Sequence, residues 1–287
     1  MRYSNNWQDY ELLDASCGER LERWGDIFLI RPDPQVIWQT KKENPLWNTP
    51  HAKYHRSDKG GGYWEEFKPV PDRWSINYKN LTFNLKPMGF KHTGLFPEQA
   101  VNWDLTAEII KKAKKPFKLL NLFAYTGGAT VSALSAGAEV VHVDASKGMT
   151  AWAKENVISS NLSERAVRFF VDDCKKLIER EIRRGNKYDG IIMDPPSYGR
   201  GPSGEIWKLE TEIHDLASKT AQLLHENSKF FIINSYTTGL SPAVMEYILG
   251  LCIKPLYGGE IKSDEIGIPV VSTGMILPCG NTAIWRK

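Results

Sequence analysis

The chain has 287 residues, 41% of them hydrophobic and 25% charged, which is typical of a globular protein with one large and one small domain. It contains no run of about 18 apolar residues and no apolar segment of a secretory signal, so we expect a cytoplasmic protein without a membrane partner. The four cysteines lie far apart, which argues against a zinc site or a disulfide framework. A net charge of +3 permits a nucleic-acid partner without requiring one.

Residues 1–95 are predicted to form a β-rich module, which is a possible substrate-binding region. Strands are predicted over 26–32, 35–40, 74–80 and 81–87. Basic and aromatic residues alternate over 38–56, a pattern that suits single-stranded RNA. The residues of this pattern are Trp38, Lys41, Lys42, Trp47, Lys53, Tyr54, His55 and Arg56. The alternative is a loop whose aromatic side chains pack on the main domain.

Residues 96–287 alternate between strand and helix patterns. The predicted strands are 117–123, 139–144, 166–171, 188–194 and 229–235, followed by two strand-like segments in the tail. The predicted helices are 97–115, 129–137, 148–161, 174–184, 208–224 and 242–252. Such alternation predicts right-handed βαβ units and an α/β domain with a mostly parallel sheet covered by helices.

The first strand of this domain runs into "NLFAYTGG", whose glycines allow a tight turn that a ligand can approach. The next strand ends at Asp144, whose carboxylate can accept hydrogen bonds from both hydroxyls of a ribose, while Ser146 can cap the following helix. The G-x-G-x-x-G spacing of dinucleotide folds is missing, which argues against NAD(P). Phe123 and Tyr125 suit the sulfonium of S-adenosylmethionine through cation–π attraction, although Phe123 can equally be a core residue.

Acidic residues also end the third and fourth strands. Asp172 or Asp173 can accept a hydrogen bond from the amine of adenine while the other caps the next helix, and the sequence does not separate these roles. The fourth strand runs into two prolines, which stiffen the chain and leave carbonyl acceptors for a flat amine or nucleobase on which a tyrosine can stack. The predicted catalytic residues are Asp194, Pro195, Pro196 and Tyr198. The plainer alternative is a strand followed by a proline turn.

Five segments together resemble the class I methyltransferases of the 23S ribosomal RNA methyltransferase I/K group, over residues 75–287. The segments are "FKHTGLFPEQ", "NLFAYTGG", "VVHVDAS", "FFVDDC" and "YDGIIMDPPSYGRG". The resemblance implies a Rossmann-like sheet of seven strands, S-adenosylmethionine as the cofactor, a ribosomal RNA base as the acceptor, and Lys91 close to the cleft. The predicted cofactor-binding residues are Thr93, Gly94, Gln99, Asn121, Phe123, Tyr125, Thr126, Gly127, Gly128, Asp144, Ala145, Ser146, Asp172, Asp173 and Asp194.

The chain departs from the family pattern at two positions. Ala100 replaces an arginine, and Thr237 stands where members that methylate carbon-5 of cytosine carry a cysteine. Carbon-5 is a poor nucleophile until a thiolate adds to its neighbour, so a nitrogen acceptor fits better. Cys174 is predicted at a helix N-terminus on the adenine side and Cys252 in the core, whereas the position of Cys279 stays open. The alternatives are an enzyme that methylates an amine of a protein or small molecule, and an NAD(P)-dependent oxidoreductase.

Overall fold

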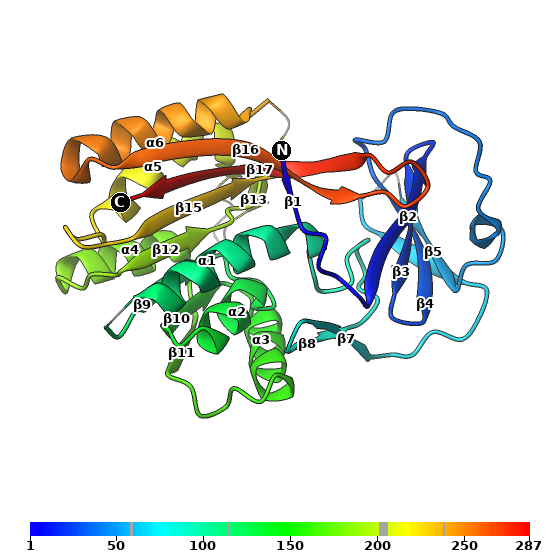
Figure 1. The fold of residues 1–287 in the computed structure, drawn as a ribbon, viewed down its shortest axis with the longest axis horizontal. Coiled ribbons are helices and arrows are strands. Elements are labelled where there is room, and N and C mark those ends of the chain that lie inside the picture. The colour runs from blue at the N-terminus through cyan, green and yellow to red at the C-terminus, as the bar shows by residue number, and fades with distance from the viewer. Residues whose placement is uncertain (58–59, 114, 201–205, 238) are drawn as a thin grey trace. The chain divides into compact units, whose positions relative to one another are not determined.

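The computed structural model describes residues 1–57, 60–113, 115–200, 206–237 and 239–287. The chain forms two units (Figure 1). The large unit consists of Met1–Arg2, Val101–Ile266 and Gly280–Lys287, and the small unit consists of Tyr3–Ala100 and Gly267–Cys279. The prediction divided the chain once, between residues 95 and 96. The structure groups the late segment 267–279 with the N-terminal residues.

An eight-stranded sheet forms the centre of the large unit, in the order β1-β16-β17-β15-β12-β9-β10-β11. Its strands are β1 (Arg2–Tyr3), β9 (Lys118–Leu122), β10 (Glu139–Asp144), β11 (Val167–Val171), β12 (Gly190–Met193), β15 (Phe230–Ser235), β16 (Glu260–Pro269) and β17 (Ile276–Arg286). Strands β11, β10, β9, β12 and β15 are parallel, and β17 is antiparallel to β15. The predicted Rossmann-like α/β class is therefore confirmed, with the two-residue β1 added at the edge of the seven expected strands.

Helices cover both faces of this sheet (Figure 1). They are α1 (Ala100–Lys112), α2 (Gly128–Ser135), α3 (Lys147–Ser159), α4 (Cys174–Arg183), α5 (Leu209–Ala221) and α6 (Pro242–Tyr257). On the face covered by α4–α6, Leu122, Ile191 and Phe231 belong to one large buried apolar cluster. The opposite face carries buried polar side chains, among them Asn121 and His142. The sheet thus has an apolar side that stabilises the fold and a polar side beneath α2.

The predicted strands and helices of the large unit are present, with ends that differ by a few residues. Besides β1, one pair of strands was not predicted. Strands β13 (Tyr198–Arg200) and β14 (Ile206–Lys208) form an antiparallel pair directly after the two prolines. Glycine, proline and serine dominate this stretch, so its sequence is typical of a loop.

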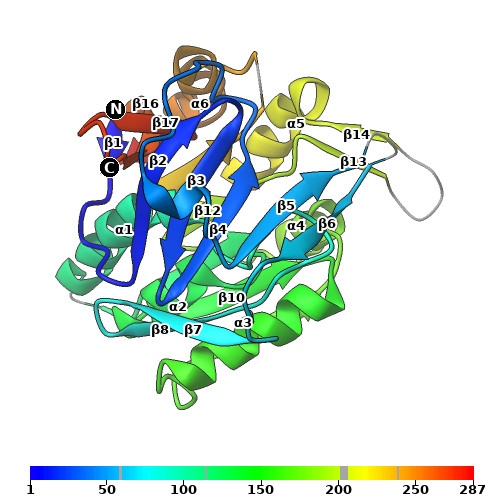
Figure 2. The ribbon, with the colours of Figure 1, turned by 90° about the vertical axis from the view of Figure 1, so that its right-hand side faces the viewer.

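The small unit is built on a five-stranded sheet in the order β2-β3-β4-β5-β6 (Figure 2). Its strands are β2 (Tyr10–Ser16), β3 (Glu19–Trp24), β4 (Ile27–Pro32), β5 (Ala52–Arg56) and β6 (Gly62–Glu66). A separate hairpin joins β7 (Trp74–Tyr78) and β8 (Leu81–Leu85), and short 3₁₀ turns are η1 (Pro45–Trp47) and η2 (Pro97–Gln99). The predicted strand over 35–40 is wrong. Its carbonyls at Val36 and Trp38 instead accept hydrogen bonds from the β2–β3 turn at Gly18 and Cys17.

The late segment belongs to the small unit because its backbone pairs with β2. Val271 and Ser272 donate their N–H groups to the carbonyls of Leu12 and Leu13, at 2.9 and 3.0 Å. The Ser272 hydroxyl also donates to Asp14 Oδ1 at 2.7 Å.

Within the described residues, no helix has both the length and the apolar character needed to cross a bilayer.

Candidate active site at the carboxyl edge of the sheet

The loop after β9 is strained. Phe123 and Tyr125 have φ values of 55° and 50°, and Gly127 has a φ of 83°. Left-handed backbone costs non-glycine residues on the order of 1 kcal/mol each and is concentrated at binding and catalytic sites. Three left-handed residues within five positions therefore identify this loop as a functional one.

Asp144 fixes the strained loop from the neighbouring strand. Its Oδ2 accepts the N–H of Tyr125 and its Oδ1 accepts the N–H of Ser146, both at 2.8 Å. Burial raises the pKa of the Asp144 carboxyl, and the two N–H groups counter this rise. Ser146 caps α3 through its own hydroxyl, which accepts the N–H of Met149, as predicted. Each Asp144 oxygen thus keeps a lone pair for a further donor.

The two glycines are required by packing as well as by the turn. A Cβ at Gly127 would lie 2.9 Å from the Cβ of Ala153 in α3, and a Cβ at Gly128 would lie 2.5 Å from Cζ2 of Trp103 in α1. The sequence interpretation gave ligand approach as the reason for both glycines. The structure adds close contact between α2 and its two neighbouring helices, which brings the first turn of α2 down onto the sheet.

A buried polar chain lies beneath α2. Asn121 Nδ2 donates to Thr130 Oγ1, and Thr130 Oγ1 lies 2.9 Å from His142 Nδ1. Burial lowers the pKa of His142 to about 3, so the imidazole is neutral. Asn121, predicted to contact the cofactor, is 3% exposed and uses its amide to support α2. Thr130 and His142 were not predicted. The only signal was a histidine inside the apolar strand "EVVHVD".

Asp172 and Asp173 have different partners. Asp173 caps α4, because its Oδ1 accepts the N–H of Lys176 at 3.0 Å. Asp172 is ion-paired with Arg180 and also accepts the N–H of Asp173. The structure thus assigns the cap, which the sequence left open, to Asp173, and both oxygens of Asp172 are engaged. Asp173 Oδ2 has no hydrogen-bond partner in the part of the chain that the structure describes.

The two prolines differ in their hydrogen bonding. The Pro196 carbonyl, predicted as a substrate acceptor, already accepts the indole N–H of Trp207 at 2.6 Å. The Pro195 carbonyl accepts no hydrogen bond from the described residues. Asp194 precedes it at the end of β12, and Tyr198 begins β13 with 51% of its surface exposed. We call residues 194–198 the rim. The Pro195 carbonyl of the rim is therefore available to a ligand, whereas the Pro196 carbonyl is bound by Trp207, which was not predicted.

Thr237 lies beside this rim. Its hydroxyl donates to the hydroxyl of Ser197 at 2.6 Å, and Ser197 directly follows Pro196. Cys174 and Cys252, the two cysteines of the large unit, are buried, and burial raises the pKa of each thiol. Cys174 begins α4, as predicted, and its Sγ accepts the N–H of Phe123. No group of three or more His, Cys, Asp or Glu side chains forms a metal site in the described parts of the chain.

Several predicted residues belong to the small unit. Thr93 and Gly94 are buried, and Gly94 has a φ of 101°. The Thr93 hydroxyl has no hydrogen-bond partner within the described ranges, and Gln99 is 8% exposed in η2. Their assignment to the cofactor stays a prediction. Cys279 is fully enclosed in this unit, and burial raises the pKa of its thiol well above the ordinary value.

The aromatic residues of the 38–56 pattern are part of the small unit's own structure. Trp47 is buried and donates its indole N–H to Asp14 Oδ2 at 2.7 Å. Tyr54 is buried as well, and Lys42 and Lys53 both pair with Glu19. Trp47 and Tyr54 are therefore not free to stack on a base.

The fold and the site define the class of this protein. A parallel sheet whose strand order reverses at β9, a strained glycine loop after that strand and a carboxylate at the end of the next strand are typical of Rossmann-like proteins that bind nucleoside cofactors. The profile of the S-adenosylmethionine-dependent methyltransferase family matches residues 50–219, more than half of the chain. The chain belongs to this family, and its cofactor is S-adenosylmethionine.

Individual relatives agree with this assignment. A crystallised S-adenosylmethionine-dependent methyltransferase from Agrobacterium tumefaciens is 32% identical, with a TM-score of 0.91 over 99% of this chain and 92% of that one. The ribosomal RNA large subunit methyltransferase K/L of Shewanella oneidensis is 34% identical over 239 residues, 79% of this chain and 30% of the relative. Its counterpart from Colwellia psychrerythraea is 26% identical over 81% of this chain and 34% of the relative. The chain thus spans about a third of these two relatives. The predicted methyltransferase activity is confirmed, and the NAD(P) alternative is not supported.

Proposed function

We propose that this enzyme methylates a nitrogen of a nucleobase in ribosomal RNA of the large subunit. The names of the curated relatives support a ribosomal RNA substrate. The observation that carries the choice of nitrogen is the Thr237 hydroxyl beside Ser197, at the position where a carbon-5 enzyme needs a thiolate. A ribosomal substrate also agrees with the cytoplasmic location expected from the sequence.

The cofactor loop fits S-adenosylmethionine. Asp144 would hold the ribose, because each of its oxygens has accepted one N–H and can accept a hydroxyl as well. Asp173 would receive the adenine amine on Oδ2, since Asp172 is committed to Arg180. The strained loop at Phe123–Gly127 would enclose the sulfonium end, with Tyr125 close to the positive charge. When bound, S-adenosylmethionine supplies an electrophilic methyl group.

The rim after β12 would orient the acceptor. An exocyclic amine can donate one N–H to the Pro195 carbonyl and the other to the Asp194 carboxylate, which leaves the nitrogen lone pair free to point at the methyl group. Tyr198, half exposed at the start of β13, would stack on the base. Positioning of this kind supplies most of the catalytic effect in a direct displacement. Asp194 would also accept the proton that the nitrogen loses after methylation.

Mass spectrometry of ribosomal RNA nucleosides tests the proposal directly. A strain that lacks the protein should lose one N-methylated nucleoside, which the wild-type chain restores and Asp194→Ala does not. Tyr198→Phe keeps the ring and should restore it. Loss of 5-methylcytosine instead would refute the nitrogen acceptor. An unchanged nucleoside profile, together with methyl transfer to a protein or small amine, would refute the RNA substrate.

A further inference from the structure

The loop between β8 and η2 is held by side chains of the small unit's sheet. Three donors hold three of its carbonyls: Trp64 Nε1–H to Met88 (2.8 Å), Tyr54 O–H to Gly89 (3.1 Å) and Arg31 Nη1–H to Lys91 (3.1 Å). The loop also closes on itself, because the N–H of Met88 donates to the carbonyl of His92 at 3.2 Å. Each such bond contributes about 1 kcal/mol, so the position of Lys91 in the small unit is well defined.

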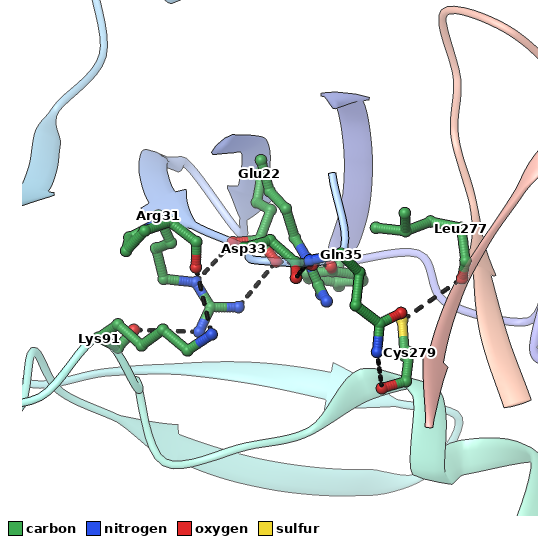
Figure 3. A network of polar contacts seen from close by, with 10 residues as sticks. Glu22, Arg31, Asp33, Gln35, Lys91, Leu277 and Cys279 are labelled. Atoms are coloured by element: carbon green, nitrogen blue, oxygen red, sulfur yellow. Dashed lines mark hydrogen bonds and ion pairs between the residues drawn. The ribbon is translucent and has the colours of Figure 1, made fainter. Parts of the chain in front are cut away.

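Arg31 is itself fixed by Glu22 (Figure 3). Its Nε and Nη2 donate to the two oxygens of Glu22, at 2.6 and 2.8 Å, and the Tyr10 hydroxyl donates to Glu22 Oε1 at 2.8 Å. Glu22 is 0% exposed, and such bidentate pairs are among the strongest charged hydrogen bonds. The Glu22 carboxylate is therefore fully used and neutralises Arg31 rather than Lys91.

Among the described residues, positive charge around Lys91 exceeds the negative charge that could balance it. The Lys91 ammonium donates to the Pro32 carbonyl at 3.2 Å and has no ion-pair partner among the described residues. The nearby acid, Asp33, is paired with Arg20. Burial, and then the guanidinium groups of Arg31, Arg20 and Arg56, lower the pKa of Lys91 to about 8, against an opposing effect of Asp33.

Arg56 adds a second cation without a counter-charge. It ends β5, its side chain is exposed, and it makes no ion pair within the described parts of the chain. It lies two residues after Tyr54 in β5 and therefore on the same face of that strand, and the Tyr54 hydroxyl donates to Gly89 of the loop that carries Lys91. The Arg56 guanidinium is also among the charges that lower the pKa of Lys91. Two cations that repel each other on a rigid support are unfavourable in the free protein, and a bound anion relieves the repulsion.

We propose that Lys91 and Arg56 form a phosphate-binding site for the backbone of the RNA substrate. The proposal rests on the proposed function above, because it takes RNA as the substrate. A phosphodiester carries the single negative charge that this pair of cations lacks, and contacts to the backbone fix the register of an RNA without reading its sequence. The small unit then serves as a clamp for the backbone rather than as an aromatic stacking platform.

Fluorescence anisotropy with a labelled single-stranded RNA of about 12 nucleotides tests the site, with the full chain titrated at several salt concentrations. Each removed phosphate contact should lower the slope of log K against log[salt] by about 0.7. Lys91→Gln and Arg56→Gln should each show this loss and bind RNA several-fold more weakly. Lys91→Arg keeps the charge and should retain the wild-type slope. Lys262→Gln, whose side chain is 85% exposed in β16, is the matched control and should also retain it.

Calorimetry with S-adenosylmethionine runs in parallel and should give the wild-type affinity for every variant, which shows that the large unit is intact. If Lys91→Gln and Arg56→Gln keep the wild-type slope while the wild type binds RNA, the phosphate site is wrong and the proposed function stands. If the wild type binds S-adenosylmethionine but shows no salt-dependent RNA binding, both the phosphate site and the proposed RNA substrate are refuted.

Discussion

At the scale of single residues, His142 couples the stability of the large unit to pH. Its pKa is about 3 in the folded chain because of burial, against an ordinary value of 6.5. Below pH 6.5 the unfolded chain therefore binds a proton that the folded chain does not, so folding weakens as the pH falls towards 3. Above pH 6.5 the imidazole is neutral in both states and makes no contribution of this kind.

We predict that His142→Gln reduces the acid sensitivity of folding. The glutamine side chain can still bond to Thr130 but has no group that titrates. Between pH 6 and pH 4 the free energy of unfolding should fall less steeply than in the wild type, by about 1.4 kcal/mol per pH unit. Urea denaturation across this range measures the slope. Equal slopes for variant and wild type would show that His142 is not the residue responsible.

At the carboxyl edge of the sheet, the cap of α3 could be predicted from the sequence, whereas most hydrogen-bond partners could not. Ser146 caps α3 as predicted, and the ribose contact of Asp144 stays a prediction. The Pro196 carbonyl was predicted to be free, but Trp207 occupies it from β14, eleven residues further along the chain. The sequence around Pro196 does not indicate this contact, because the contact depends on the strand pair β13–β14, which was not predicted.

At the scale of elements, the N-terminus of α4 carries a helix cap that is also the proposed contact for the adenine amine. Asp173 caps this helix, and Ser241 caps α6 in the same way by accepting the N–H of Val244. Asp173→Ala and Ser241→Ala should each cost about 1 kcal/mol of unfolding free energy. Only Asp173→Ala should also weaken S-adenosylmethionine, as measured by calorimetry. Equal cofactor affinity in the two variants would remove Asp173 from the adenine site.

The first turn of α2 offers a second test at this scale. We expect Gly128→Ala to destabilise the protein by about 1–3 kcal/mol, because the new Cβ would overlap Trp103. Gly250→Ala is the control, since its Cβ would meet no atom closer than 4.0 Å and α6 should gain about 0.5–1 kcal/mol. Guanidinium denaturation separates the two signs. A neutral or stabilising Gly128→Ala would mean that α2 is not packed tightly against α1.

Elements with strong periodicity were predicted well, and those that depend on distant partners were not. β9, β10 and β15 are rich in apolar residues, and each was placed within one or two residues. The segment 35–40 has the composition of a strand, yet the N–H groups of Cys17 and Gly18 bind its carbonyls in a turn contact. Trp47 and Tyr54 belong to the pattern that suits RNA binding, yet both are buried. Their burial depends on the sheet of the small unit, which the local sequence does not reveal.

At the scale of the whole molecule, the division into units is not contiguous in sequence. Gly267–Cys279 belongs with Tyr3–Ala100 because Val270 bridges to Leu12 across more than 250 residues. A domain boundary predicted from composition alone cannot show that a segment near the end of the chain belongs to the N-terminal unit. The α/β class of the large unit, by contrast, follows from the alternation of strands and helices along residues 96–287, a pattern that is local at every step.

The residues proposed to hold the cofactor, Asp144 and Asp173, belong to the large unit, so bound S-adenosylmethionine should stabilise that unit by mass action, by about 2.7 kcal/mol at a ligand concentration of 100 Kd. The most direct test of the account is calorimetry of S-adenosylmethionine with the wild type and with Asp144→Ala. Two lost hydrogen bonds to a carboxylate should weaken binding by about 100-fold or more. Asp215→Ala, an exposed acid on α5, should bind like the wild type. Equal affinity for wild type and Asp144→Ala would contradict the placement of the cofactor at the end of β10.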